Sequence, residues 1–284
     1  MVSIVITAYN VEEWIRECVE SALGQTFKET EVLVVEDCST DSTRDILSDI
    51  NDRRLRTLYN DTNIGAGASR KRGIEAAHGE YILLLDGDDC LEKNFIEELY
   101  NEAVRNDADI VSGGITIVHA DGLHETSSYG NCIAEGEDKI LKFWGEKVVF
   151  MNNKLIRRSL HRKVPYCTRR FIEDTPVIIP MLYHANKVVY TRNCGYHYRM
   201  NDGSLTHRAT PFKKALFRAL CAEDIISFFE KEDMGFLKRM PFATAYSQCI
   251  RAIKECHPTP LMVEPYKEEW IEFTVKLMGR LGEK

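Results

Sequence analysis

The feature that most constrains this fold is a regular alternation of short apolar runs with longer segments of helical periodicity. Four apolar runs are expected to be strands: Val2–Thr7, Glu31–Val35, Leu55–Tyr59 and Tyr81–Leu85. Between them, residues 11–23, 39–50 and 63–78 carry helical spacing or helix-start signals. Strands that alternate with helices at this spacing form βαβ units, so the sequence predicts an α/β fold with a mostly parallel sheet flanked by helices.

Polar side chains follow the ends of these predicted strands. Thr7 and Tyr9 end the first strand, Asp37 follows the second, and Asp86 and Asp88 follow the fourth. In open parallel sheets, ligands bind at the carboxyl ends of the strands, where the strand order changes direction. We therefore expect these groups, which are far apart in the sequence, to meet at one edge of the sheet.

The fourth strand ends in the acidic segment Asp86-Gly-Asp-Asp89, with three carboxylates in four positions. Packing does not explain this cluster, because like charges repel and each must stay hydrated or find a cation. Two carboxylates two residues apart can bind one divalent ion through oxygen, and Gly87 allows a tight turn beside a ligand. The alternative is an acidic turn that starts the next helix.

Composition narrows the function classes. The 284 residues carry 37 Lys and Arg against 44 Asp and Glu, a formal charge of −7, which argues against a general nucleic-acid binder. The nine cysteines contain no C-x-x-C pair, so no zinc or redox site is indicated. Scattered thiols, no signal peptide and no apolar run of about 20 residues predict a cytoplasmic protein without a transmembrane segment.

The second half is less regular. Ile110–Val118 is strand-like, with a break at Gly113-Gly114 that we interpret as a bulge. From Pro211 onward the pattern is helical. We place a boundary near residue 208, with a catalytic domain over 1–208 and a helical C-terminal appendage over 209–284. Three roles are compatible with this appendage: it could bind the acceptor, form a homodimer interface or contact a membrane surface.

Five segments in order resemble the family 2 inverting glycosyltransferases of the GT-A fold, which is Rossmann-like. They read V-S-I-V-I-T-A-Y-N, E-V-L-V-V-E-D-C-S-T-D-S-T, N-I-G-A-G-A-S-R, G-E-Y-I-L-L-L-D-G-D-D and E-D-T. The resemblance covers roughly residues 1 to 205. It implies a nucleotide-diphospho-sugar donor, with UDP as the expected nucleotide, and Mn²⁺ or Mg²⁺ as cofactor. The implied acceptor is a glycan or a lipid-linked glycan, which places the enzyme in the cytoplasm or at the inner face of the membrane.

The resemblance also assigns roles to the strand-end residues. Asp88 matches the metal ligand, and Asp86 matches a position on the metal shell or the ribose. Asp37 matches the carboxylate that pairs with the nucleobase, with a helix N-cap as the structural alternative. Tyr9 would stack on the base and Thr7 would hydrogen-bond it; the alternative for Tyr9 is a core position.

Two basic residues are assigned in the same way. The segment Gly65-Ala-Gly-Ala-Ser-Arg70 is neither a Walker A loop nor a dinucleotide fingerprint. It matches the family's Gly-to-Arg segment beside the nucleotide, where Arg70 can reach the base or the phosphates. Arg199, in a Tyr-x-Tyr-Arg stretch, would steady the diphosphate or the acceptor.

Inversion needs a base on the face opposite the leaving group. The family's acidic pair is matched by Glu173-Asp174, and we choose Asp174 as the base, with Glu173 as the alternative. The structural alternative is a helix N-terminus, which favours acidic residues.

Two other classes compete with a glycosyltransferase. A sugar nucleotidyltransferase would normally carry a Gly-rich, basic loop after the first strand, whereas Ala8–Glu13 is acidic and contains no glycine. A non-catalytic sugar-nucleotide binder would share the donor site, but it would not depend on Asp174.

Overall fold

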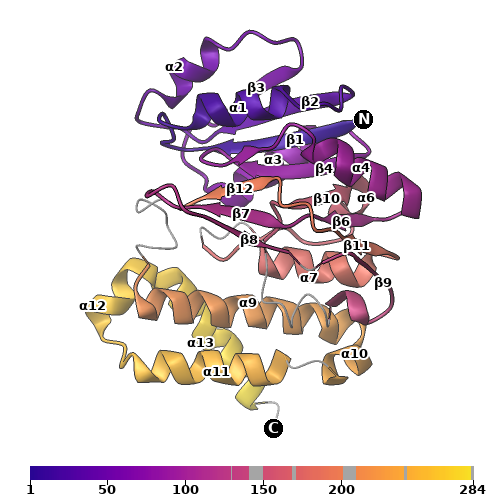
Figure 1. Cartoon of the computed structure of the whole chain (residues 1–284). Helices are drawn as coiled ribbons and strands as arrows, with labels where there is room; N and C mark the ends of the chain where they lie inside the picture. Colours follow the sequence, from indigo (N-terminus) through magenta and orange to yellow (C-terminus); the bar gives the residue numbers. More distant parts are fainter. Residues whose placement is uncertain (129, 141–149, 168–170, 201–208, 240–241, 283–284) are drawn as a thin grey trace. The chain divides into compact units, whose positions relative to one another are not determined.

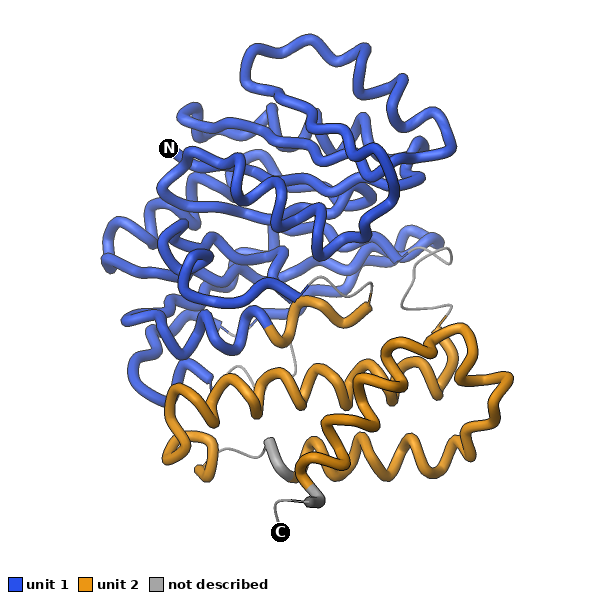
Figure 2. The backbone as a smooth tube through the Cα atoms, turned by 180° about the vertical axis from the view of Figure 1, so that it is seen from behind, with its two compact units in different colours: residues 1–170, 177–201 blue, residues 171–176, 202–284 orange. Residues whose placement is uncertain are grey.

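The computed structural model describes residues 1–128, 130–140, 150–167, 171–200, 209–239 and 242–282. Its contacts divide into two compact units (Figure 2). The first comprises residues 1–170 and 177–201, and the second comprises 171–176 and 202–284. The predicted boundary near residue 208 lies in a stretch outside the described residues, so it stays a prediction.

An eight-stranded sheet forms the centre of the first unit, in the order β3-β2-β1-β4-β10-β6-β11-β9 (Figure 1). The half from β3 to β4 is parallel throughout, whereas β10 lies antiparallel between β4 and β6. The predicted α/β fold with flanking helices is confirmed. The strands are β1 (Val2–Ala8), β2 (Thr30–Glu36), β3 (Leu55–Tyr59), β4 (Tyr81–Asp86), β6 (Ile110–Ser112), β9 (Cys132–Ala134), β10 (Lys154–Arg157) and β11 (Val188–Tyr190).

Helices cover both faces of this sheet, because successive strand residues point to opposite sides. Ile4 and Ile6 of β1 share one buried cluster with side chains of α1 and α4. Val5 points to the other face, where it lies against Gly73 of α3. The helices of this unit are α1 (Ile15–Leu23), α2 (Thr43–Ser48), α3 (Ala66–Ala76), α4 (Phe95–Asn106), α6 (Arg158–His161) and most of α7 (Thr175–His184).

The break at Gly113-Gly114 is not a bulge, which corrects the sequence interpretation. The chain leaves the large sheet after β6 and enters a second, four-stranded sheet of order β5-β12-β7-β8. A Cβ at Gly113 would lie 2.7 Å from the ring of Phe95, and one at Gly114 would lie 2.6 Å from Cys194 Sγ. The crossing therefore requires glycine at both positions. These strands are β5 (Cys90–Leu91), β7 (Ile115–Val118), β8 (His124–Ser127) and β12 (Tyr196–Arg199).

The second unit is helical, as predicted from Pro211 onward. Thr210 caps its first helix by accepting the Lys213 amide, and Pro211 takes the first turn, where no N–H is needed. Phe171 is grouped with this unit, and its ring centroid lies 5.5 Å from that of Phe217. The elements are α9 (Pro211–Glu232), α10 (Met234–Arg239), α11 (Phe242–Glu255), α12 (Pro260–Val263), a 3-10 turn (Glu264–Tyr266) and α13 (Lys267–Gly282).

Within the described ranges, no helix is both long enough and apolar enough to cross a bilayer.

The packing of α3 on the sheet generates a stability prediction. A Cβ at Gly73 would lie 2.4 Å from Val5 Cγ1 and 3.1 Å from Val35 Cγ2. Gly73→Val should therefore destabilise the first unit by about 1–3 kcal/mol through overpacking. The urea midpoint of unfolding measures this loss.

Gly279 of α13 is the matched control, because a Cβ built there would have no heavy atom of the described residues within 4 Å, apart from its chain neighbours and the backbone of its own helix. Gly279→Ala should raise stability by about 0.5–1 kcal/mol, since alanine favours the helix interior. An unchanged midpoint in Gly73→Val would contradict the packing described here.

Candidate functional site

The carboxyl ends of β2, β1 and β4 lie side by side. In the register of the sheet, Thr7 pairs with Val35 on one side and with Asp86 on the other. The Asp37 amide continues the ladder by donating to the Ala8 carbonyl at 2.8 Å. The order of the sheet thus places Thr7, Asp37 and Asp86 at one edge.

Protein donors hold both carboxylate oxygens of Asp86. The Arg70 guanidinium donates to Oδ1 at 2.8 Å, and Thr7 Oγ1 donates more weakly to the same oxygen at 3.4 Å. Asn152 Nδ2 donates to Oδ2 at 2.6 Å. Because the Arg70 side chain is only 8% exposed, this ion pair is poorly screened by solvent and fixes the orientation of the carboxylate.

Asp89 supports the acidic loop from inside. It is 1% exposed; Tyr196 donates its hydroxyl to Oδ2 at 2.5 Å, and the Arg199 amide donates to Oδ1 at 2.9 Å. Burial raises the pKa of Asp89 well above its usual value, and the carboxylates of Asp88 and Asp86 raise it further. Asp89 therefore anchors the loop and does not face a ligand.

Arg199 also holds the loop. Its Nε donates to the Asp88 carbonyl at 3.0 Å, and its terminal nitrogen pairs with Glu17 Oε2 at 2.9 Å. Gly87 completes the turn, since a Cβ there would lie 2.8 Å from the Thr7 carbonyl oxygen. Contact of Arg199 with a diphosphate or an acceptor stays a prediction.

Asp37 holds the loop in front of α3. Its carboxylate accepts from Asn60 Nδ2 at 2.7 Å, from the Ile64 amide at 2.9 Å and from the Gly65 amide at 2.8 Å. Gly65 has φ 88°, a conformation that favours glycine. Asp37 is not the N-cap of α2, because Ser42 takes that position.

Tyr9 is 46% exposed, which rules out the alternative that it is an ordinary core residue. By contrast, Glu36 is fully buried and accepts from the Arg44 guanidinium at 3.0 Å and from the Ser39 amide at 2.6 Å. Glu36 is therefore structural. Tyr9 offers an accessible ring at the edge where Thr7 and Asp86 lie.

The side chains of this site could bind a hard divalent ion only if a bound ligand supplied further oxygen atoms. Among the described residues, no group of three or more His, Cys, Asp or Glu side chains is placed to hold a metal. Asp86 and Asp88 supply carboxylates, and Asp88 is half-buried. Mg²⁺-type sites commonly use one or two carboxylates together with substrate phosphates and water, so these residues fit an ion shared with a diphosphate.

Glu173 and Asp174 immediately precede α7 and belong to the segment 171–176, which is grouped with the second unit. The residues that hold the acidic loop all belong to the first unit. The structure describes each unit by itself, so the assignment of Asp174 as the base, with Glu173 as the alternative, stays a prediction.

Sequence reasoning missed three residues of this site: Glu17, Asn152 and Tyr196. Glu17 lies in α1, Asn152 lies just before β10, and Tyr196 begins β12. The available signals were weak: two adjacent amides before a strand, and the first tyrosine of Tyr-x-Tyr-Arg.

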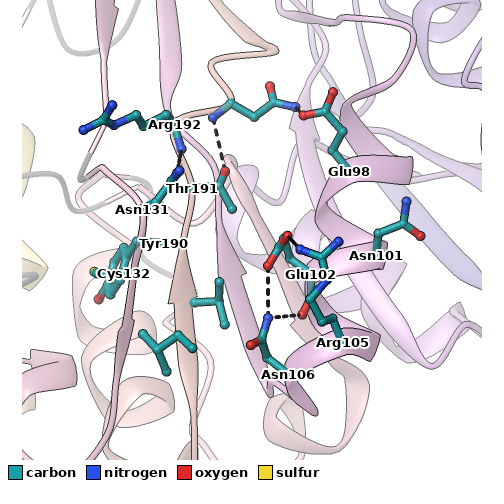
Figure 3. Close-up of a pocket in the computed structure, with 13 residues that line it drawn as sticks. Glu98, Asn101, Glu102, Arg105, Asn106, Asn131, Cys132, Tyr190, Thr191 and Arg192 are labelled. Carbon is teal, nitrogen blue, oxygen red and sulfur yellow. Dashed lines mark hydrogen bonds and ion pairs between the residues drawn. The ribbon is translucent and has the colours of Figure 1, made fainter.

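A separate groove of about 650 Å³ lies between α4 and the strands β9 and β11 (Figure 3). Its polar side chains bond to one another: Asn193 donates to Glu98, and Asn106 donates to Glu102. None of the predicted site residues lines this groove.

Sequence comparison identifies relatives of this chain. The model of the family described as glycosyl transferase family 2 matches residues 3–165. The glycosyltransferase GlyG of Streptococcus pneumoniae is 30% identical over 245 residues, which cover 82% of this chain and 79% of GlyG. The putative glycosyltransferase EpsH of Bacillus subtilis is 32% identical over 77% of this chain and 65% of its own length.

Structural comparison finds the same fold in a known protein. The crystal structure of S. aureus TarS 1-349 superposes with a TM-score of 0.70 at 20% identity, covering 97% of this chain and 79% of TarS 1-349. The complex of TarS 1-349 with UDP-GlcNAc gives a TM-score of 0.65 at 20% identity, over 99% and 92% of the two chains. These matches confirm the predicted GT-A fold.

The Arg70–Asp86 pair generates a prediction. Arg70→Met leaves a partly buried carboxylate without its cation, so we expect stability to fall by about 1–3 kcal/mol. The urea midpoint of unfolding measures it. Lys71→Met is the control, because Lys71 is exposed and, among the described residues, its one ion pair is with Glu75 on the same helix surface. A loss no larger than that of the control would contradict the role of this pair.

Proposed function

The chain belongs to glycosyl transferase family 2, and on that premise we propose that it transfers a sugar, with inversion, from a UDP-sugar to an acceptor hydroxyl. The observation that carries the proposal is the acidic loop after β4, held in place by Arg70 and Arg199 at the carboxyl edge of the sheet. The complex of TarS with UDP-GlcNAc supports UDP as the nucleotide of the donor.

We assign the nucleoside to the edge formed by β1 and β2. The exposed ring of Tyr9 would stack on the base, and Thr7 would hydrogen-bond it. Asp37 Oδ2 accepts one bond from Gly65, and a carboxylate oxygen has two lone pairs. The second lone pair would accept the N3–H of uracil.

We assign the diphosphate to the acidic loop. When bound there, Mn²⁺ or Mg²⁺ would neutralise charge on the leaving diphosphate. Asp88 would hold the ion, with Asp86 on its shell or on the ribose. Arg70 offsets the charge of Asp86 and keeps this carboxylate oriented. The glycines around Arg70 let the backbone approach the nucleotide closely.

The acceptor needs a base. Asp174, with Glu173 as the alternative, would take the proton of the acceptor hydroxyl as that oxygen attacks the sugar carbon from the side opposite the diphosphate. The proton goes to the carboxylate, and the sugar–phosphate bond breaks as the new glycosidic bond forms.

A glycan or a lipid-linked glycan is the proposed acceptor class, as in polysaccharide biosynthesis. The cytoplasmic location, the peripheral membrane contact and the homodimer stay predictions. A nucleotidyltransferase function is disfavoured, because segment 8–13 at the end of β1 is acidic and lacks the glycines and basic residues that would bind a triphosphate.

Removal of the main metal ligand should weaken donor binding. Asp88→Asn should lower Mn²⁺-dependent affinity for UDP by at least about tenfold, because a neutral amide attracts the ion less. Calorimetric titration of UDP with and without Mn²⁺ measures this. Asp121→Asn, in the exposed turn before β8, is the control. If UDP binds the wild type equally well with and without Mn²⁺, the metal assignment is wrong.

Removal of the base should separate binding from turnover. Asp174→Asn should lower kcat by about 10²–10⁴-fold while UDP affinity stays unchanged. Transfer assays with a panel of UDP-sugars and Mn²⁺ measure kcat. Full turnover in both Asp174→Asn and Glu173→Gln would exclude this acidic pair as the base.

A further inference from the structure

The hydroxyl of Tyr196 makes hydrogen bonds to three residues: Asp89, Asp86 and Asn152. It donates to Asp89 Oδ2 at 2.5 Å and accepts the Asp86 amide at 3.4 Å and Asn152 Nδ2 at 3.2 Å. A phenol has one donor and two acceptor lone pairs, so all of its hydrogen-bonding capacity is used. Because the side chain is fully buried, this geometry is shielded from water.

Asn152 is the second member of this network. It is 4% exposed, and its amide nitrogen donates one hydrogen to Asp86 Oδ2 and the other to Tyr196. Its Oδ1 is buried and has no hydrogen-bond partner within the described part of the chain. A flipped amide would set that oxygen against the Asp86 carboxylate, so the two donated bonds alone fix its orientation.

The Asp86 carboxylate therefore accepts hydrogen bonds on both oxygens, from Arg70 at Oδ1 and from Asn152 at Oδ2. An arginine fork can pair with both oxygens of a carboxylate. Without Asn152, the Asp86 carboxylate could rotate into a bidentate pair with Arg70. Its two oxygens would then no longer have the orientation that they have here.

We propose that Asn152 is a positioning residue that, with Tyr196, holds the Asp86 carboxylate in the orientation used for donor and metal binding. This inference rests on the proposed function. It adds Asn152, just before β10, and Tyr196 of β12 to the residues that position the acidic loop. Neither residue needs to touch the donor.

The test compares two adjacent buried amides. Asn153 is 1% exposed, but its Nδ2 donates to the Gly113 carbonyl and its Oδ1 accepts from Lys154 Nζ at 2.7 Å, away from Asp86. Asn152→Ala and Asn153→Ala should both lower the urea midpoint. Only Asn152→Ala should lower Mn²⁺-dependent UDP affinity, by about tenfold or more. The ratio of affinities with and without Mn²⁺ is the readout that a purely structural role would not move.

Tyr196→Phe provides a second variant that keeps the ring packing and removes only the hydroxyl. It should lower the same affinity ratio in the same direction, and it decides the matter if Asn152→Ala does not fold. Equal ratios in Asn152→Ala and Asn153→Ala, or a wild-type ratio in Tyr196→Phe, would overturn the positioning role. A wild-type protein that binds no UDP would instead overturn the proposed function, and this inference with it.

Discussion

The ion pair between Arg70 and Asp86 is the interaction on which the site depends. A carboxylate at the end of a strand buried on both faces is costly unless a cation and hydrogen-bond donors compensate it. Arg70 reaches it from α3 at 2.8 Å, across the carboxyl edge of the sheet. The pair thus links the packing of α3, through Gly73, to the position of the acidic loop.

The small second sheet has a role beyond completing the fold. Its strand β12 supplies Tyr196 to Asp89 and Arg199 to the backbone of Asp88. Strand β12 pairs with β7, which enters the small sheet directly after Gly113-Gly114, where side chains would collide with Phe95 and Cys194. Two glycines in an apolar run therefore help to position a loop that precedes them by more than twenty residues.

The sequence was informative wherever local pattern decides structure. The alternation of strands and helices predicted the sheet, and the rule of strand ends predicted that Thr7 and Asp86 would meet, as their contact confirms. It could not predict Asn152 or Tyr196, because their contacts depend on β10 inserting antiparallel beside β4 and on the crossing to the second sheet. Neither event leaves a periodic signal. The roles of Asp174 and Asp88 rest on resemblance and stay proposals.

We expect the loop held by Arg70, Asn152, Tyr196 and Arg199 to bind a metal together with a nucleoside diphosphate. Anomalous diffraction at the manganese edge, from crystals grown with UDP and Mn²⁺, tests it most directly. We expect a single strong peak in direct contact with the Asp88 carboxylate and the diphosphate oxygens. A peak elsewhere, or UDP bound away from the carboxyl edge of β1 and β4, would contradict it.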